Sequence, residues 1–102
     1  MEKDTHITEV IFRVDTSKDK WGVFAILPYE MFDTNGNVTV YAHIGQHFSG
    51  NYTHCVATSK LAVLEDYKDL KAEMESLGYN LKVIYKRNYD KYLTEYRNLL
   101  KK

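Results

Sequence analysis

Apolar and polar residues follow the period of a β-strand on both sides of the dipeptide Asn35-Gly36. The runs that flank the dipeptide cover residues 21–32 and 38–47. Asn-Gly between two such runs is the strongest short-range signal for a β-hairpin, because both central residues of a type I′ turn adopt positive φ. The pattern therefore predicts a hairpin with a two-residue turn at its tip.

Four strands are predicted before the first helix. Residues 8–14 carry an apolar side chain at every second position, which is typical of a strand with a buried face. Residues 21–27 are apolar at both parities, so we expect this strand in the centre of the sheet. A bulge or break is expected at Pro28, which cannot donate to a strand ladder. Residues 37–46 form the third strand, and residues 52–58 form a short fourth strand after a turn.

The third strand separates its side chains by parity into two faces. The apolar face carries Val38, Val40, Ala42 and Ile44, and the polar-aromatic face carries Thr39, Tyr41, His43 and Gly45. This separation predicts that the second face is open, and that Tyr52 on the next strand extends it.

Helical periodicity replaces the strand pattern in the second half of the chain. Residues 62–77 carry an apolar stripe at helical spacing, and Gly78 is placed to close that helix with Tyr79 as a hydrophobic contact back onto its last turn. Residues 81–86 alternate again and predict a fifth strand. Residues 89–100 have a second helical stripe.

The order β-β-β-β-α-β-α predicts an α+β fold with an antiparallel or mixed sheet and a helix packed on one face. A long helical crossover allows the fifth strand to lie parallel to an earlier one. The length predicts a single domain over residues 1–102, with a frayed end at residues 1–6 and a C-terminal helix in residues 89–102.

Composition limits the cellular setting. A single cysteine, Cys55, excludes an intramolecular disulfide, and no signal-peptide pattern opens the chain, so a cytoplasmic location without a membrane span is expected. The formal net charge is zero, but residues 79–102 carry seven lysines and arginines against two acidic residues. An acidic body with a basic C-terminal segment is the compositional feature that points to a partner.

Several short pieces of the chain form a set: Val10-Ile11-Phe12-Arg13, Leu27-Pro28, His43-Ile44-Gly45-Gln46-His47, Glu65-Asp66-Tyr67 and Leu77-Gly78-Tyr79-Asn80-Leu81-Lys82-Val83-Ile84. Together, over roughly residues 8–88, they resemble a family of short bacterial proteins found in gut anaerobes and on mobile elements. No activity is established for that family. The resemblance therefore implies a bacterial, cytoplasmic origin and assigns a role to no residue.

Three histidines, His43, His47 and His54, are the candidate metal ligands. The first two share a face of a continuing strand, and the third arrives across a short turn. Three imidazoles with an open position suit catalytic zinc. A strand nevertheless separates residues i and i+4 by about 13 Å, too far for one metal unless the chain bends at Gly45. We therefore predict no metal site.

A catalytic hypothesis combines Glu30, Tyr41 and His43. An unbroken register from the two-residue turn brings Glu30 opposite Tyr41, with His43 diagonally adjacent on the same face. Such a group can exchange protons at neutral pH, as in a small hydrolase or a metal-dependent enzyme. Because Pro28 disturbs the register and no Gly-rich phosphate loop is present, we predict no catalytic residue and no cofactor.

The basic C-terminal segment interleaves cations with aromatic rings, a mixture that suits single-stranded nucleic acid. Its candidate binding residues are Lys82, Lys86, Arg87, Tyr89, Lys91, Tyr92 and Tyr96, and Tyr41, His43 and Tyr52 extend the surface on the sheet. In the alternative interpretation, the same tyrosines form a packing stripe and the lysines occupy its solvated side.

Nine tyrosines exceed what a small core needs, and tyrosine is enriched at interfaces. The C-terminal helix docks either on its own sheet or on that of a neighbour, which would give a homodimer. We therefore predict a non-enzymatic binding module that contacts a protein or a second copy through the Tyr-rich sheet face and this helix. Binding of single-stranded nucleic acid through residues 82–102 is the first alternative, and an enzyme using His43 and Glu30 is the second.

Overall fold

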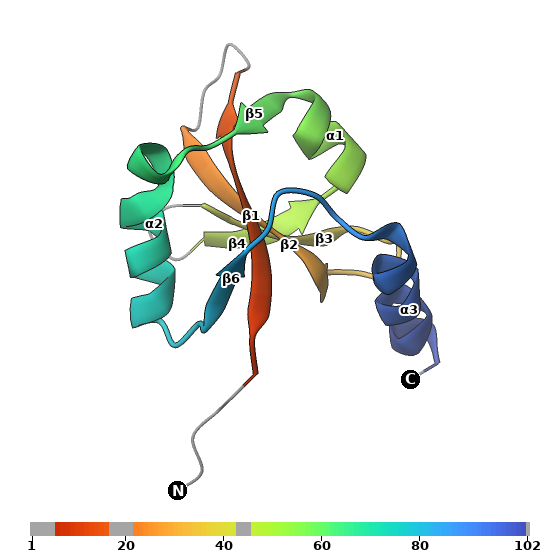
Figure 1. The fold of residues 1–102 in the computed structure, drawn as a ribbon. Helices are drawn as coiled ribbons and strands as arrows, with labels where there is room; N and C mark the ends of the chain where they lie inside the picture. The colour runs from red at the N-terminus through yellow and green to blue at the C-terminus, as the bar shows by residue number, and fades with distance from the viewer. Residues whose placement is uncertain (1–5, 17–21, 43–45, 102) are drawn as a thin grey trace, which may run out of the picture.

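A computed structural model describes residues 6–16, 22–42 and 46–101. One sheet lies between two layers of helix, with α2 on one face and α1 and α3 on the other (Figure 1). The strands are β1 (Thr8–Asp15), β2 (Val23–Met31), β3 (Val38–Ala42), β4 (Gln46–Gly50), β5 (Ser59–Leu61) and β6 (Leu81–Val83). The helices are α1 (Tyr52–Ala57), α2 (Leu64–Ser76) and α3 (Tyr89–Leu100).

The sheet is mixed. Its strands lie in the order β4-β3-β2-β1-β5, and all of these neighbours are antiparallel. Both β5 and β6 pair with β1: β5 pairs with residues 13–15, and β6 runs parallel to residues 8–10. The predicted α+β class is confirmed, and the crossover through α2 gives the parallel pair.

The α2 face of the sheet holds the first of two apolar clusters. Phe12, Leu27 and Tyr41 are almost completely buried there against Leu70 and Met74 of α2. These contacts come from alternate positions along each strand, as the period of a strand requires. The predicted packing of a helix on one face is therefore confirmed.

The opposite face is covered as well. Ile11, Ile26 and Val40 are completely buried on this side, together with Phe24 and Val38. Half-buried side chains of α1 and α3 pack against them: Tyr52, Cys55 and Val56 from α1, and Tyr92 from α3. The C-terminal helix thus docks on its own sheet.

Three predicted strands differ from the structure. The fifth, expected over residues 81–86, is β6 and ends at Val83. The third strand, expected over residues 37–46, ends at Ala42, and β4 returns antiparallel to it; residues 43–45, which separate them, lie outside the described residues. The fourth strand, expected over residues 52–58, is wrong. That segment is α1, whose first turn is capped by the Asn51 side chain, which accepts a hydrogen bond from the His54 amide.

The hairpin around Asn35-Gly36 is present, but its turn is longer than predicted. The Phe32 amide donates to the Asn37 carbonyl at 2.9 Å, which closes a four-residue loop rather than a two-residue turn. The Asp33 carboxylate accepts bonds from the backbone amides of residues 35 and 37 inside this loop, and Gly36 has the positive φ, 88°, that the bend requires. The expected irregularity at Pro28 is confirmed, because the β2–β3 register shifts between Leu27 and Met31.

The predicted helix ends in the second half agree closely with the structure. α3 has the expected bounds, and α2 closes at Gly78, where φ is 105°. The Gly78 amide donates to Glu75 and the Tyr79 amide to Met74, which is the Schellman pattern that glycine favours. None of the helices in the described ranges is long and apolar enough to cross a membrane.

Candidate binding surfaces

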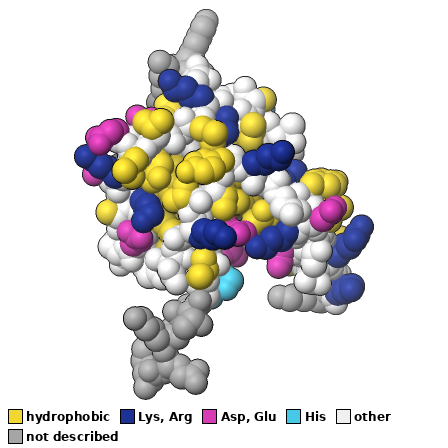
Figure 2. Space-filling model, viewed as in Figure 1, with side chains coloured by type: hydrophobic (Ala, Val, Ile, Leu, Met, Phe, Trp, Pro, Cys, Tyr) yellow, Lys and Arg dark blue, Asp and Glu magenta, His cyan; other side chains and the backbone are white. Residues whose placement is uncertain are grey.

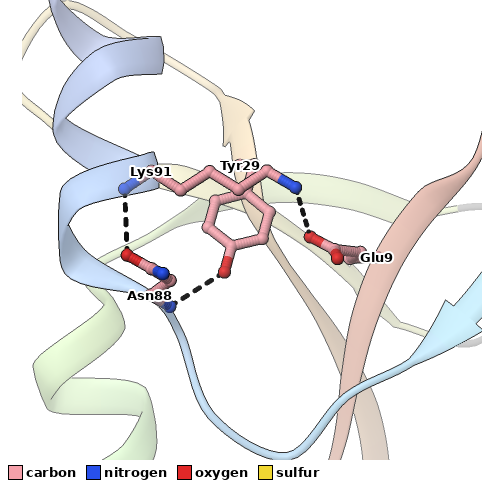
Figure 3. Close-up of polar contacts among 4 residues, drawn as sticks. All are labelled: Glu9, Tyr29, Asn88 and Lys91. Carbon is pink, nitrogen blue, oxygen red and sulfur yellow. Dashed lines mark hydrogen bonds and ion pairs between the residues drawn. The ribbon is translucent and has the colours of Figure 1, made fainter.

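The start of α3 is anchored to the sheet by polar contacts (Figure 3). The Asn88 side chain caps the helix by accepting from the Lys91 backbone amide at 3.1 Å, and the backbone amide of Asn88 donates to the Tyr29 hydroxyl at 2.8 Å. The Lys91 ammonium lies 2.7 Å from a Glu9 carboxylate oxygen and 4.5 Å from the centre of the Tyr29 ring. Hydrogen bonding to Glu9 raises the pKa of Lys91. Lys91 is therefore engaged within the chain.

Arg87 is half-buried and is also engaged in contacts within the chain. Its guanidinium carbon lies 4.0 Å from the centre of the Tyr52 ring and 4.1 Å from that of Tyr92, and its backbone amide donates to the Tyr52 hydroxyl at 3.0 Å. Tyr89 lies farther off, at 5.5 Å. Because cation–π contacts join these side chains, the predicted surface residues Tyr52, Arg87 and Tyr92 form a cluster that links α1 to α3.

Tyr92 and Tyr96 reach the tip of the first hairpin. Their hydroxyls donate to the carbonyls of Gly36 at 2.6 Å and Thr34 at 2.8 Å, and their rings stack at 6.1 Å. The packing-stripe interpretation of these two tyrosines therefore describes their contacts better than a row of free rings.

Tyr41 does not lie where the sequence suggests. It pairs with Ala25 because the bulge in β2 and the four-residue loop shift the register, so the prediction that it faces Glu30 is wrong. Tyr41 is completely buried, and its hydroxyl donates to a carboxylate of α2. The prediction of an open face around Tyr41 is also wrong, because α2 covers this side of the sheet. His43 lies outside the described residues.

The two described histidines of the candidate metal site are exposed on different elements. His47 on β4 contacts Tyr41 and Tyr79 on the α2 side of the sheet, whereas His54 belongs to α1, which packs on the other side. The described ranges contain no group of three side chains arranged to hold a metal ion.

The most exposed part of the predicted surface lies at the edge of the sheet, where β5 and β6 pair with different parts of β1. Tyr85, which follows β6, exposes 66% of its surface, and Lys82 and Lys86 are exposed. Tyr89, the first residue of α3, exposes 57% and lies beside Tyr92. Exposed aliphatic residues missed by sequence analysis follow β5: Leu61 at its end, then Val63 and Leu64. Val63 and Leu64 do not pack in the apolar cluster between α2 and the sheet. Their spacing from Tyr67 matches the apolar stripe of α2, so no signal in the sequence marked them as exposed.

Figure 2 shows hydrophobic side chains gathered in the middle of the face that presents β5 and β6, with both basic and acidic side chains around them. We name the surface the β5–β6 edge, defined by Leu61, Val63, Leu64 and Tyr85 together with the exposed Lys60, Lys82 and Lys86. None of these three lysines forms an ion pair within the described part of the chain.

Comparison with known proteins gave no match among family models, curated proteins or solved structures. The resemblance to short bacterial proteins therefore stays a prediction, and the functional argument rests on this chain's own surfaces.

Proposed function

We propose that this protein is a non-enzymatic binding module that holds an acidic protein segment on the β5–β6 edge. The observation that carries the proposal is that Leu61, Val63, Leu64 and Tyr85, at or just after β5 and β6, which both pair with β1, are between 44% and 66% exposed. Figure 2 shows hydrophobic side chains gathered on the face that presents these strands. Apolar patches on an open sheet edge cost solubility and mark interaction surfaces.

The lysines of the patch favour an acidic partner, because the acidic residues that follow Leu64 are engaged within the chain: Glu65 lies 3.3 Å from the Lys68 ammonium, and the Asp66 carboxylate accepts from the Val63 amide. Lys60, Lys82 and Lys86 are exposed and form no ion pair with a described residue. A symmetric dimer through this edge would bring the same lysines of two copies together, and juxtaposed like charges oppose association. A different chain with carboxylates around an apolar centre fits better than a second copy.

Nucleic acid is less well supported than protein. Arg87, Lys91 and Tyr92 make contacts within the chain, which leaves fewer cations and ring faces for bases. The aliphatic side chains of the edge offer no stacking surface, although stacking supplies much of the affinity for single strands. We place the module in the cytoplasm, which suits the free thiol of Cys55.

The test is a selection of displayed random peptides on the immobilised full chain, followed by anisotropy titrations of the enriched peptides. We expect enriched sequences to combine leucine or aromatic residues with aspartate or glutamate. The double variant Leu61→Ser, Leu64→Ser should weaken their binding by about tenfold or more, because truncating central apolar contacts costs the most. Lys82→Ala with Lys86→Ala should reduce the salt dependence of binding.

The matched control is Leu100→Ser, which changes a leucine that is 53% exposed at the end of α3, and it should bind the peptides like the unmodified chain. Failure to enrich peptides, or enriched peptides that bind the double variant equally well, would overturn the proposal. Labelled single-stranded DNA and RNA are titrated in parallel at two salt concentrations. Salt-sensitive binding of these strands, without peptide binding, would replace the protein partner by nucleic acid.

A further inference from the structure

A cavity of about 540 Å³ opens beside the C-terminal end of α2. The residues that matter for its chemistry are His6, Thr8, Glu30, His47, Tyr79 and Asn80. Cavities of this size are typical of small-ligand sites. The cavity shares no residue with the β5–β6 edge, so its role is independent of the function proposed above.

Local structure fixes the walls of this cavity. The Schellman turn after α2 places Tyr79 at the start of the segment leading to β6, and the Thr8 amide donates to the Asn80 carbonyl at 2.8 Å. From β4, the Nε2 atom of His47 lies 2.8 Å from the Tyr79 hydroxyl. Three segments that are distant in the sequence are thus joined by hydrogen bonds around the cavity.

Glu30 supplies a carboxylate to this cavity. Its side chain is exposed and makes no hydrogen bond or ion pair with a described residue. Burial, and then the charge of Glu30, raise the pKa of Tyr79, so its ring stays uncharged at neutral pH. A second cavity of about 140 Å³ also contacts Glu30, and its walls include Glu9, Glu95 and Lys91, whose ammonium is paired with Glu9. Carboxylates thus outnumber ammonium groups around Glu30. The local charge therefore favours a cation.

Another part of the same chain shows how a carboxylate and an aromatic ring together bind an ammonium group. At the start of α3, the Lys91 ammonium is held by the Glu9 carboxylate at 2.7 Å and by the Tyr29 ring at 4.5 Å (Figure 3). Carboxylate and aromatic face together satisfy the charge of an ammonium group and cover its alkyl stem. Glu30 and Tyr79 provide the same two kinds of group, and no lysine of the described residues is paired with them.

The geometry points to a binding site for a primary alkylammonium group, held by the Glu30 carboxylate against the aromatic wall formed by Tyr79 and His47. Leu77 gives the cavity an apolar wall for the alkyl chain. The ligand is either a free amine or the lysine side chain of another protein, because both present the same group.

Titrations of the ¹⁵N-labelled full chain, followed by amide chemical shifts, test this site. The probes are n-butylamine, its uncharged analogue n-butanol, and Nα-acetyl-lysine amide. We expect saturable shifts at His47, Tyr79 and Asn80 with the amines, with dissociation constants on the order of a millimolar, and none with butanol. Glu30→Gln should weaken amine binding about tenfold or more, whereas Asp69→Asn, at an exposed carboxylate of α2, should leave it unchanged.

The two amines distinguish the sources of the ligand. Tighter binding of the lysine derivative indicates a protein side chain, and tighter or equal binding of butylamine indicates a free amine. Equal affinity of the Glu30→Gln variant, equal shifts with butanol, or shifts that never saturate would each overturn the site. Because the peptide selection above does not involve Glu30, failure of one proposal is distinguishable from failure of the other.

Discussion

The hydroxyl of Tyr92 donates a hydrogen bond of 2.6 Å to the carbonyl of Gly36 and so joins the last helix to the tip of the first hairpin. Tyr96 repeats the contact one turn later, on the carbonyl of Thr34. The Tyr92 ring also stacks on the guanidinium of Arg87. Helix α3 is consequently a structural layer that covers one face of the sheet.

We expect Tyr92→Phe to lower the free energy of unfolding by about 0.5–1.5 kcal/mol, because one partly buried hydrogen bond is lost while the ring remains. Urea denaturation of the full chain measures the difference. Tyr89→Phe is the control, because Tyr89 is 57% exposed and its hydroxyl bonds to no described residue, so its effect should stay within about 0.5 kcal/mol. Equal losses in the two variants would contradict the structural role of the Tyr92 hydroxyl.

Gly50 is a site of close packing between β4 and its neighbours. A Cβ atom there would lie 2.4 Å from the Cγ2 atom of Val40 and 3.2 Å from the sulfur of Cys55. We therefore expect Gly50→Ala to destabilise the chain by about 1–3 kcal/mol, as overpacking of a core usually does.

The matched test of this clash adds Val40→Ala to the Gly50→Ala variant. Removing the Val40 methyl groups makes room for the new Cβ, so the double variant should lose less stability than the sum of the two single changes. Thermal or urea unfolding of the unmodified chain, the two single variants and the double variant completes this double-mutant cycle. Additive losses would show that the clash is not the cause.

The sequence predicted correctly those elements that depend on residues close together in the chain. Gly78 followed by Tyr79 ends α2 because a left-handed residue and a hydrophobic contact close a helix within a few residues. The apolar stripe of Tyr89–Leu100 repeats at helical spacing, so α3 also emerges from the sequence alone.

The α1 segment shows why the apolar pattern of a short segment is ambiguous. Tyr52 and Val56 are four residues apart, a spacing that fits both a strand and a helix. A segment of six residues has too few apolar positions to separate the two periods. The contacts of α1 with the second apolar cluster come from Tyr52, Cys55 and Val56, which is helical spacing, but only the fold shows which period is used. The side-chain cap from Asn51 was the local signal that the strand prediction overlooked.

The sites depend on contacts between residues that are distant in the sequence. Tyr41 was expected on an open face because strand parity places it with the polar residue Thr39, yet its hydroxyl donates to Glu73 on α2 and the ring is buried. Likewise, the cavity brings Glu30 near Tyr79, a pair that strand periodicity does not connect. Exposure at Lys82, Lys86 and Tyr89 was predictable, because polar and flanking positions of short elements face solvent.

Cys55 should react slowly with alkylating reagents. Burial, with a smaller contribution from Asp15, raises the pKa of its thiol, and the thiolate is the reactive form. Mass spectrometry of iodoacetamide labelling at neutral pH should give a rate well below that of the same chain in denaturant. Equal rates in the folded and unfolded chain would contradict the half-buried, protonated thiol.

Asp33 should make the hairpin loop sensitive to acid. Hydrogen bonds, chiefly from the Asn37 side chain and then from the Asn35 amide and the Ser49 hydroxyl, outweigh desolvation and lower the pKa of Asp33. The folded pKa lies below the ordinary value of about 3.9, so the charged form is favoured by folding. This stabilisation is complete above the unfolded pKa and is lost as the pH falls through the folded pKa.

Asp33→Asn removes the charge, but it also replaces one of two acceptor oxygens by an amide donor, so the pH dependence of the stability difference, and not its size, reports the charge. We expect the unmodified chain to be more stable than the variant near neutral pH and the difference to shrink as the pH falls below about 4. Urea unfolding of both proteins across that range measures the difference, and the other carboxylates cancel because both chains carry them. A stability difference that stays constant with pH would mean that the Asp33 charge contributes nothing to the loop.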